Sequence, residues 1–222
     1  MISNQKIFEK EHHIMAKLRN HENIVHLIGS VASEKHATPY LIMHLFTKGD
    51  LSRFLSAAGQ EYSEIFKIDA INDILKGMKF VHENNIWHLD LAARNCLVTD
   101  EGRIKIGDFG NASFAKRGKK DLPSKVNYRW MPPEVLRKQT ITWKTDVWSF
   151  GIVIHEICHA GKLPWQDLPI LEDLPKAAEI MENEPLPGSN LNSDVDQMMK
   201  SCLAKLKKRP SFQKLSLLPL PK

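Results

Sequence analysis

Two short segments of the sequence contain side chains whose types suit chemistry on phosphate groups. Residues 88–95 read HLDLAARN, and Asp108-Phe109-Gly110 begins thirteen positions after Asn95. Asp90 and Asn95 share one loop and Asp108 ends the hairpin expected after it, so two carboxylates and an amide oxygen can converge. Hard divalent cations prefer such oxygens and share them with phosphate, while a further carboxylate can accept the proton of an attacking hydroxyl. The spacing therefore predicts a magnesium and phosphate site.

Three predicted elements would position these segments. A long amphipathic helix begins after Ser63, which can cap it, and ends near Asn84. Residues 95–99 and 103–106 are typical of a hairpin, because Asp100-Glu101-Gly102 between them has turn chemistry. Residues 146–158 are apolar nearly all round, which predicts a helix buried in the middle of the molecule.

The N-terminal part is predicted to add one helix and a small sheet. Residues 5–18 have apolar side chains at helical spacing, and Glu11 lies within that apolar stripe. Its carboxylate must reach water or a cation, since an unpaired buried charge is costly. Residues 24–31 and 40–46 are short apolar runs that indicate two antiparallel strands, and Asp50 can cap a short helix over 51–55.

Composition and length indicate an ordinary soluble globular protein. The 222 residues are 42% hydrophobic and 26% charged, which excludes disordered and fibrous classes. The longest apolar run, 150–154, is far shorter than the roughly 18 residues of a spanning helix, so we expect no transmembrane segment in this chain. The N-terminus has no signal pattern, which favours a cytoplasmic location, and three cysteines without close pairing indicate buried, reduced thiols.

The formal net charge of +5 gives little support for a nucleic-acid partner. Basic residues are concentrated at 116–120 and 205–209. No aromatic residues are interleaved with them to stack bases, so we interpret both clusters as solvated charge and expect no nucleic acid among the partners.

The order of five motifs resembles that of the protein kinases, and specifically of the tyrosine kinases. The motifs are HLDLAARN at 88–95, Asp108-Phe109-Gly110, WMPPE at 130–134, DVWSFG at 146–151 and Arg209-Pro210. Ala92-Ala93-Arg94 is similar to the tyrosine-specific catalytic loop, because serine/threonine kinases usually have a lysine two positions after the aspartate. The resemblance implies phosphoryl transfer from ATP and Mg²⁺ to a protein substrate that carries tyrosine.

The same resemblance implies an α+β, protein-kinase-like fold. Residues 1–46 would form a partial N-lobe, with a small sheet and one helix, and residues 47–222 a mainly helical C-lobe. It makes Asp90 the catalytic base, places Arg94 near the substrate hydroxyl or phosphate, and makes Asn95 and Asp108 the metal ligands.

Further roles implied by the resemblance concern the nucleotide and the support of the loop. Met43 would be the gatekeeper and Leu97 would lie under the adenine ring. His44, Leu45 and Phe46 would form the hinge that binds adenine, and Glu11 matches the helix glutamate that pairs with a strand lysine. Glu134 would pair with Arg209, Asp146 would anchor the catalytic loop, and Tyr128 would belong to the substrate platform.

Two departures from the family pattern lower the expected activity. The sequence contains no glycine-rich loop and no strand lysine ahead of Glu11, so the isolated chain is expected to be weak or inactive. Leu89 replaces the arginine that usually precedes the catalytic aspartate, which argues against the usual phosphorylation control. A pseudokinase-like scaffold or protein-interaction module is therefore the alternative function.

A more remote alternative comes from residues 155–159, which read HEICH. On a helix this pattern can place two imidazoles on one zinc ion with the glutamate as base, as in a zinc peptidase. The motif is short, and the segment belongs to the helix predicted to be buried, so ordinary core histidines are the preferred interpretation.

Overall fold

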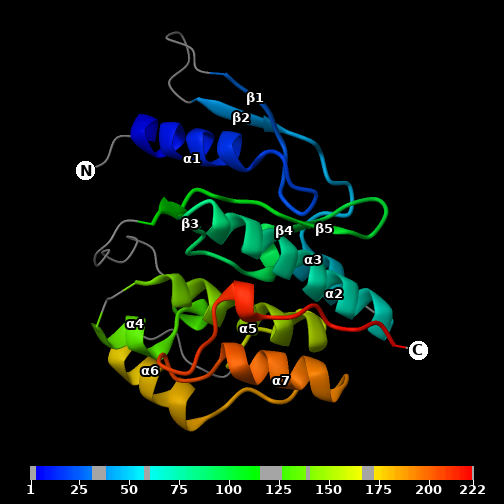
Figure 1. Cartoon of the computed structure of the whole chain (residues 1–222), viewed down its shortest axis with the longest axis vertical. Helices are drawn as coiled ribbons and strands as arrows, with labels where there is room; N and C mark the ends of the chain where they lie inside the picture. The colour runs from blue at the N-terminus through cyan, green and yellow to red at the C-terminus, as the bar shows by residue number, and fades with distance from the viewer. Residues whose placement is uncertain are drawn as a thin grey trace.

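The computed structural model describes residues 4–31, 39–57, 61–115, 127–138, 141–166 and 173–221. The described chain has an α+β fold, with small antiparallel sheets in its first half and helices in its second (Figure 1). The helices are α1 (Asn4–Leu18), α2 (Leu51–Ser56), α3 (Glu64–Glu83), α4 (Pro133–Lys138), α5 (Trp143–Cys158), α6 (Leu174–Asn183) and α7 (Ser193–Cys202). The strands are β1 (Leu27–Val31), β2 (Tyr40–Met43), β3 (Ile86–Trp87), β4 (Cys96–Val98), β5 (Ile104–Ile106) and β6 (Ser113–Phe114). Short 3-10 helices are η1 (Ala93–Asn95), η2 (Tyr128–Trp130) and η3 (Phe212–Lys214). The basic cluster at 116–120 lies outside the described residues.

Helix α1 and the two-stranded sheet β1–β2 form the upper part of the molecule in Figure 1. The strands are antiparallel, from Leu27 opposite Met43 to Val31 opposite Tyr40. Both predicted runs are longer than the strands, and in the first of them Ile24 pairs in parallel with Ile106 of β5 instead. The backbone bonds are Ile106 N to Asn23 O at 2.8 Å and Val25 N to Ile106 O at 2.9 Å. These bonds join the upper part to the β4–β5 hairpin below it.

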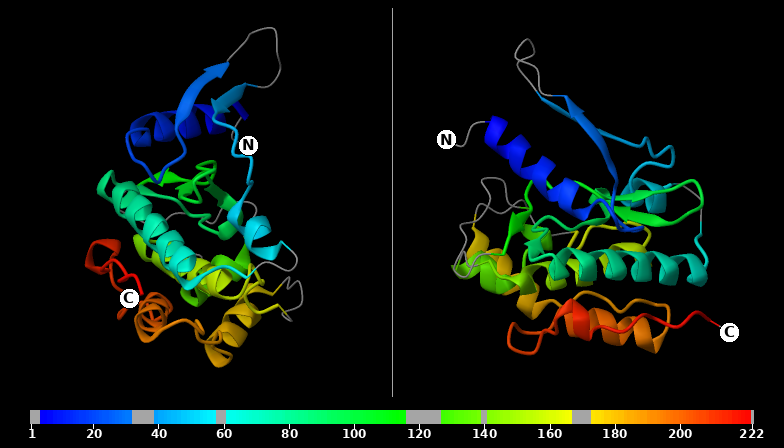
Figure 2. Two further views of the ribbon diagram at one scale, coloured as in Figure 1. Left: turned by 90° about the vertical axis from the view of Figure 1, so that its right-hand side faces the viewer. Right: turned by 45° about the horizontal axis from the view of Figure 1, so that its top comes forward.

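The β4–β5 hairpin lies between α1 and the helices (Figures 1 and 2). Its strands pair from Cys96 with Ile106 to Val98 with Ile104, as the turn predicted. Asp73 on α3 holds the hairpin, since its buried carboxylate accepts hydrogen bonds from Ile104 N at 3.0 Å and from Arg103 Nε at 2.8 Å. The hairpin therefore has a fixed position above α3.

Local capping explains where the main helices begin. Ser63 caps α3 and accepts a hydrogen bond from Phe66 N at 3.2 Å, and Asp50 caps α2, both as predicted. Helix α5 begins three residues earlier than the predicted Asp146, because Thr142 and Thr145 form a reciprocal capping box. Nearly every residue of α5 is buried, which confirms the predicted central helix.

One main hydrophobic core runs through the described chain. Its largest fully buried side chains include Phe109, Phe150 and Phe212, and α1 contributes Ile14 and Leu18. The three cysteines are buried and free, as predicted. The division into residues 1–46 and 47–222 stays a prediction, since the same core contains side chains from both ranges.

Candidate active site

The loop that contains Asp90 is fixed from below by Asp146 of α5. Asp146 Oδ1 accepts a hydrogen bond from Leu89 N and Oδ2 one from His88 N, each at 2.8 Å, and Oδ2 also lies 2.8 Å from His82 Nε2. Leu89 has a φ of +66°, a left-handed conformation that non-glycine residues avoid. The buried carboxylate therefore holds a backbone conformation that the loop would not adopt alone, which is the anchoring role predicted for Asp146.

A second buried acid of α5 fixes the other end of the loop. Glu156 Oε2 accepts hydrogen bonds from Ala93 N and Trp130 Nε1, each at 3.0 Å. Burial raises the pKa of the Glu156 carboxyl to about 7, although these two hydrogen bonds oppose the shift. The Arg94 guanidinium lies over the Trp130 ring, 4.5 Å from its centroid. Glu156 thus joins the loop at 88–95 to the segment at 128–131.

The Asp90 carboxylate receives hydrogen bonds from three side chains. Arg94 Nη2 lies 2.5 Å from Oδ1, which also accepts from Asn127 Nδ2 at 3.1 Å, while Oδ2 accepts from Asn111 Nδ2 at 3.2 Å. The resemblance implied that Arg94 lies near the substrate hydroxyl or phosphate, and it did not identify either asparagine. The only sequence signal for Asn111 is its place directly after Gly110, and nothing local distinguishes Asn127.

Asn95 and the segment before Asp108 are joined through the backbone. Asn95 Nδ2 donates to Asp90 O at 2.6 Å, which leaves Asn95 Oδ1 available as an acceptor. Gly107 N donates to Asn95 O at 2.8 Å, and His88 Nε2 lies 3.0 Å from Gly107 O. Asp108 itself is exposed and has a φ of +53°. The structure therefore brings the two predicted segments together.

Glu11 of α1 lies beside the Asp-Phe-Gly segment. A Cβ placed on Gly110 would lie 3.6 Å from Glu11 Oε2 and 3.3 Å from Asp108 Oδ1. Burial raises the pKa of Glu11, and the charge of Asp108 raises it further. Among the described residues no cation lies within ion-pair distance of this carboxylate, but Lys10 acts on it at longer range.

Lys10 is a cation at this site that sequence reasoning missed. Its Nζ donates to Gly110 O at 3.0 Å, and burial lowers its pKa while the charge of Glu11 opposes that shift. The sequence signal that could have identified Lys10 is its position directly before Glu11. An ammonium group therefore reaches the Asp-Phe-Gly segment from α1.

The residues predicted around the adenine lie in two places, at the end of β2 and just after it, and in β4. Met43 ends β2 and is 41% exposed, while His44 and Leu45 are exposed, Leu45 to 88%. Phe46 and Leu97 are partly buried and pack against the main core. The structure thus brings Phe46 and Leu97 to one core and leaves the Leu45 side chain in solvent.

Leu89 belongs to a separate apolar cluster. It is 4% exposed and packs with buried residues of α4, α6 and their surroundings. The other members include Met131, Val135, Leu136, Ile141 and Met181. Tyr128, predicted as part of the substrate platform, is partly buried against the same cluster. The position where the resemblance implied an arginine is therefore part of the protein interior.

The HEICH segment has the geometry of packed histidines with a glutamate bound elsewhere. The rings of His155 and His159 stack with centroids 4.2 Å apart, and burial lowers the pKa of His155 to about 4. Glu156 is bound to Ala93 and Trp130, so it is not free to act as the base of a zinc site. Among the described residues no three His, Cys, Asp or Glu side chains are grouped as metal ligands.

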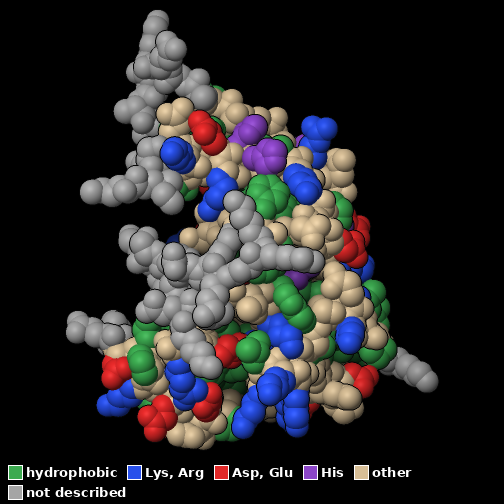
Figure 3. Space-filling view, turned by 60° about the vertical axis from the view of Figure 1, so that its left-hand side comes forward, with side chains coloured by type: hydrophobic (Ala, Val, Ile, Leu, Met, Phe, Trp, Pro, Cys, Tyr) green, Lys and Arg blue, Asp and Glu red, His purple; other side chains and the backbone are tan. Residues whose placement is uncertain are grey.

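Histidine side chains also gather over α1 (Figure 3), where His13 packs edge-on against Phe114 with centroids 5.4 Å apart.

A family model described as protein tyrosine and serine/threonine kinase matches residues 1–218. The chain is 36% identical to the insulin-like growth factor 1 receptor of Xenopus laevis over 72% of the chain and 12% of that protein. It is 31% identical to the cytoplasmic tyrosine-protein kinase BMX of Mus musculus, over 94% of the chain and 32% of that protein. It is 33% identical to protein-tyrosine kinase 6 of Mus musculus, over 95% of the chain and 46% of that protein. The chain therefore spans less than half the length of each of these relatives.

No helix in the described parts of the chain is long and apolar enough to cross a membrane.

Proposed function

The chain belongs to the protein tyrosine and serine/threonine kinase family, and on that basis we propose that it is a protein-tyrosine kinase domain. Its reaction would be transfer of a phosphoryl group from ATP–Mg to tyrosine in a protein substrate. Two of the relatives are named tyrosine-protein kinases, and the Ala92-Ala93-Arg94 segment supports the same hydroxyl preference. A cytoplasmic location is part of the proposal, which the name of one relative supports.

The observation that carries the proposal is the convergence of Asp90, Asn95 and the segment that leads into Asp108. Asn95 is hydrogen bonded to both, at 2.6 Å to Asp90 O and at 2.8 Å to Gly107 N. The first bond is made by the Asn95 side chain and the second by its backbone oxygen, so Asn95 joins the segments that contain Asp90 and Asp108, which are separated along the sequence. A hard divalent cation and a phosphate group require oxygens such as those of these side chains.

The residues present fit Mg²⁺. Asn95 Oδ1 and the exposed Asp108 carboxylate would hold the ion, since magnesium is usually bound by one or two protein oxygens together with substrate phosphates. When bound, ATP–Mg supplies the phosphoryl group and the positive charge that balances it. No thiol or imidazole is required by this proposal.

Asp90 is the group proposed to accept the proton of the tyrosine hydroxyl. Its carboxylate is partly buried and accepts hydrogen bonds only, so it is an acceptor at the place where the substrate hydroxyl must donate. Arg94 Nη2 at 2.5 Å fixes the orientation of Oδ1. The platform proposed for the substrate backbone is the segment that contains Tyr128.

The isolated chain is proposed to transfer phosphate slowly. Positioning and charge supply most of the catalysis of phosphoryl transfer, and the 222 residues contain neither a glycine-rich loop nor a strand lysine. Lys10, which donates to Gly110 O, is the cation that α1 supplies in that neighbourhood. Residues 1–46 as a partial N-lobe and 47–222 as a C-lobe remain the proposed division.

A second candidate function is a pseudokinase-like scaffold. Two observations favour it: Asn111 and Asn127 occupy both oxygens of the Asp90 carboxylate, and Leu89 is buried where a regulatory cation was expected. The scaffold would retain the kinase surface for protein partners and bind ATP poorly. The two candidates share the fold and differ in their chemistry.

A phosphorylation assay with a tyrosine-containing peptide, ATP and Mg²⁺ distinguishes them. The chain is expected to give slow tyrosine phosphorylation that Asp90→Asn abolishes, while the matched control Asp194→Asn, an exposed acid in the first turn of α7, leaves it unchanged. Phosphate transfer that persists in Asp90→Asn would contradict the assigned base. No transfer and no stabilisation by ATP–Mg in thermal unfolding would favour the scaffold.

A further inference from the structure

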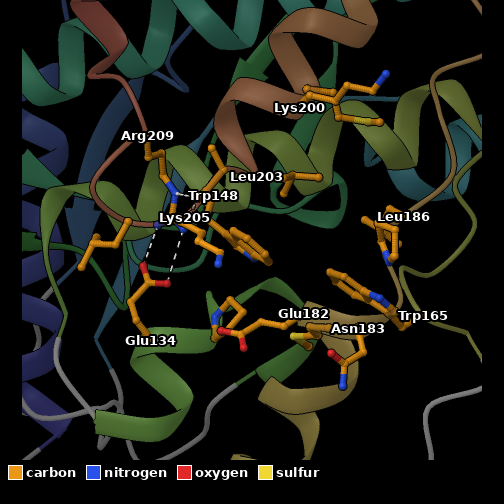
Figure 4. A pocket seen from close by; sticks show the side chains of 16 residues that line it. Glu134, Trp148, Trp165, Glu182, Asn183, Leu186, Lys200, Leu203, Lys205 and Arg209 are labelled. Carbon is orange, nitrogen blue, oxygen red and sulfur yellow. Dashed lines mark hydrogen bonds and ion pairs between the residues drawn. The ribbon is translucent and has the colours of Figure 1, made fainter.

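A cavity of about 690 Å³ lies between α4, α5, α6 and α7 (Figure 4). Its lining includes neither Asp90, Asn95 nor Asp108, so it is separate from the proposed phosphoryl-transfer site. Its volume falls within the range of sites that bind small organic molecules, roughly 300–1,000 Å³.

The walls of the cavity are suited to an aromatic ring. Trp148 and Trp165 both line it, and their rings are parallel within 6° with centroids 6.4 Å apart. The thioethers of Met181 and Met199 line it as well, and thioether sulfur makes favourable contacts with aromatic rings. The Arg209 guanidinium also lies over the Trp148 ring, 5.0 Å from its centroid, so Trp165 and the two thioethers are the surfaces that a flat ring would contact.

The charges around the cavity leave an excess of positive charge. The two acids in the lining are each paired with an arginine: Glu134 with Arg209 at 2.7 Å, and Glu182 with Arg137, whose second contact is 2.8 Å. The lining also contains Lys200 and Lys205. Among the described residues, neither ammonium group lies within ion-pair distance of a carboxylate.

The positions of the two lysines differ in Figure 4. Lys205 projects toward the interior of the cavity near Trp148, and Lys200 stands at its edge. The hydrogen bond from Arg137 is the main cause of the lowered pKa of Glu182, and the charge of Lys205 lowers this pKa further from long range. An anionic group in the cavity would supply the partner that Lys205 lacks at short range.

One buried donor in the lining also lacks an acceptor. Trp148 is 5% exposed, and its Nε1 has no hydrogen-bond partner among the described residues. A buried N–H without a partner is unfavourable. An oxygen of an occupant that reached Nε1 would supply the missing acceptor.

From these observations we infer that the cavity binds a small aromatic carboxylate. The ring lies against Trp165 and the thioethers, and the carboxylate interacts with Lys205. Aromatic walls alone would bind a neutral ring equally well, so the positive charge of Lys205, supported by Lys200 at the edge, selects the acid. The inference concerns a second site and does not depend on whether the chain transfers phosphate.

Isothermal titration of the full chain with 4-phenylbenzoate, and with its neutral amide, tests this inference. The carboxylate is expected to bind with a Kd below about 1 mM, and the amide about tenfold more weakly. Saturating ATP–Mg should leave the Kd of the carboxylate unchanged, because the cavity is separate from the nucleotide. Equal binding of acid and amide, or competition by ATP–Mg, would overturn the inference.

Variants locate the site. The double variant Lys200→Gln/Lys205→Gln should weaken binding of 4-phenylbenzoate about tenfold and leave the amide unchanged, whereas the control Lys207→Gln/Lys208→Gln, which removes two neighbouring exposed charges outside the lining, should not. Leu186→Trp fills the cavity and should abolish binding of both compounds. Unchanged affinity in the first variant or in Leu186→Trp refutes the site. If a variant fails to fold, the acid and amide comparison on the unaltered chain still decides.

Discussion

The side-chain amide of Asn127 donates a hydrogen bond to Asp90 Oδ1 over 3.1 Å. Asn111 does the same to Oδ2 over 3.2 Å, so amides from two separate parts of the chain bind the two oxygens of one carboxylate. This carboxylate is the proposed acceptor of the tyrosine proton. Asn127 therefore occupies an acceptor position that a substrate hydroxyl would use.

Asn127→Ala is expected to strengthen the binding of a tyrosine peptide. The substitution removes a donor that competes with the hydroxyl for Asp90 Oδ1, and a hydrogen bond to a charged group is worth about 1.5–3 kcal/mol before the competing interactions are subtracted. Fluorescence polarisation of a labelled peptide should show a Kd about three- to tenfold lower. In an Asp90→Ala background the same change should have no effect, and an equal gain there would contradict competition at Asp90.

Asp146→Asn is expected to destabilise the fold by about 3 kcal/mol. The amide would face the Leu89 and His88 N–H groups with one oxygen instead of two, so a buried donor loses its acceptor. Urea denaturation followed by circular dichroism measures the loss. Asp173→Asn is the matched control, because asparagine caps the start of α6 as well as aspartate does. Equal midpoints for the two variants would show that the loop does not depend on this carboxylate.

Leu89→Arg is expected to destabilise the protein instead of restoring phosphorylation control. Leu89 is 4% exposed within an apolar cluster, so a guanidinium there would be buried without a partner at a cost of about 2–4 kcal/mol. Leu89→Met is the control, because methionine is apolar and has a similar volume. It should lower the free energy of unfolding by less than about 1.5 kcal/mol. A midpoint for Leu89→Arg equal to that of the native chain would mean that the interior can accommodate the cation.

The Glu156 carboxyl should make stability decrease between about pH 5 and pH 7. Its pKa in the folded chain is raised to about 7 by burial, against an ordinary value of 4.5, so in this interval the unfolded chain has lost a proton that the folded chain retains. The contribution is present below the ordinary value and is lost as pH rises through about 7, and its size is on the order of 3 kcal/mol.

Glu156→Gln isolates that contribution. The glutamine oxygen can still accept from Ala93 N and Trp130 Nε1, but it does not titrate. As pH rises from 5 to 7, the free energy of unfolding of the native chain should therefore fall relative to that of the variant. His155, whose pKa is lowered to about 4 by burial, changes stability in the opposite direction between about pH 4 and 6.5 and cancels in this difference. Parallel pH curves would contradict the raised pKa.

Sequence patterns predicted the elements that depend on local chemistry. Ser63 and Asp50 cap helices where expected, because capping involves residues three positions apart. The parallel pairing of Ile24 with Ile106 was not predicted, because it joins residues far apart in the sequence and shows no local pattern. The short apolar run that contains Ile24 indicated a strand paired with residues 40–46 instead.

The candidate site was predictable only where the motif itself contained the residues. HLDLAARN and Asp-Phe-Gly identified Asp90, Asn95 and Asp108, and the structure joins their segments through Gly107. Asn127 could not be predicted, because its contact with Asp90 arises from tertiary folding of a loop. The burial of Leu89 was hidden for the same reason, since α4 and α6 cover it from later parts of the chain.

The pairing of Ile24 with Ile106 also has a mechanical consequence. The two bonds, from Ile106 N to Asn23 O and from Val25 N to Ile106 O, attach the turn after α1 to the backbone two residues before Asp108. A movement of α1 would pull on that attachment point. Either the two hydrogen bonds break, or the carboxylate of Asp108 moves with the helix. As long as these two bonds persist, the turn after α1 and the backbone that leads into Asp108 are coupled.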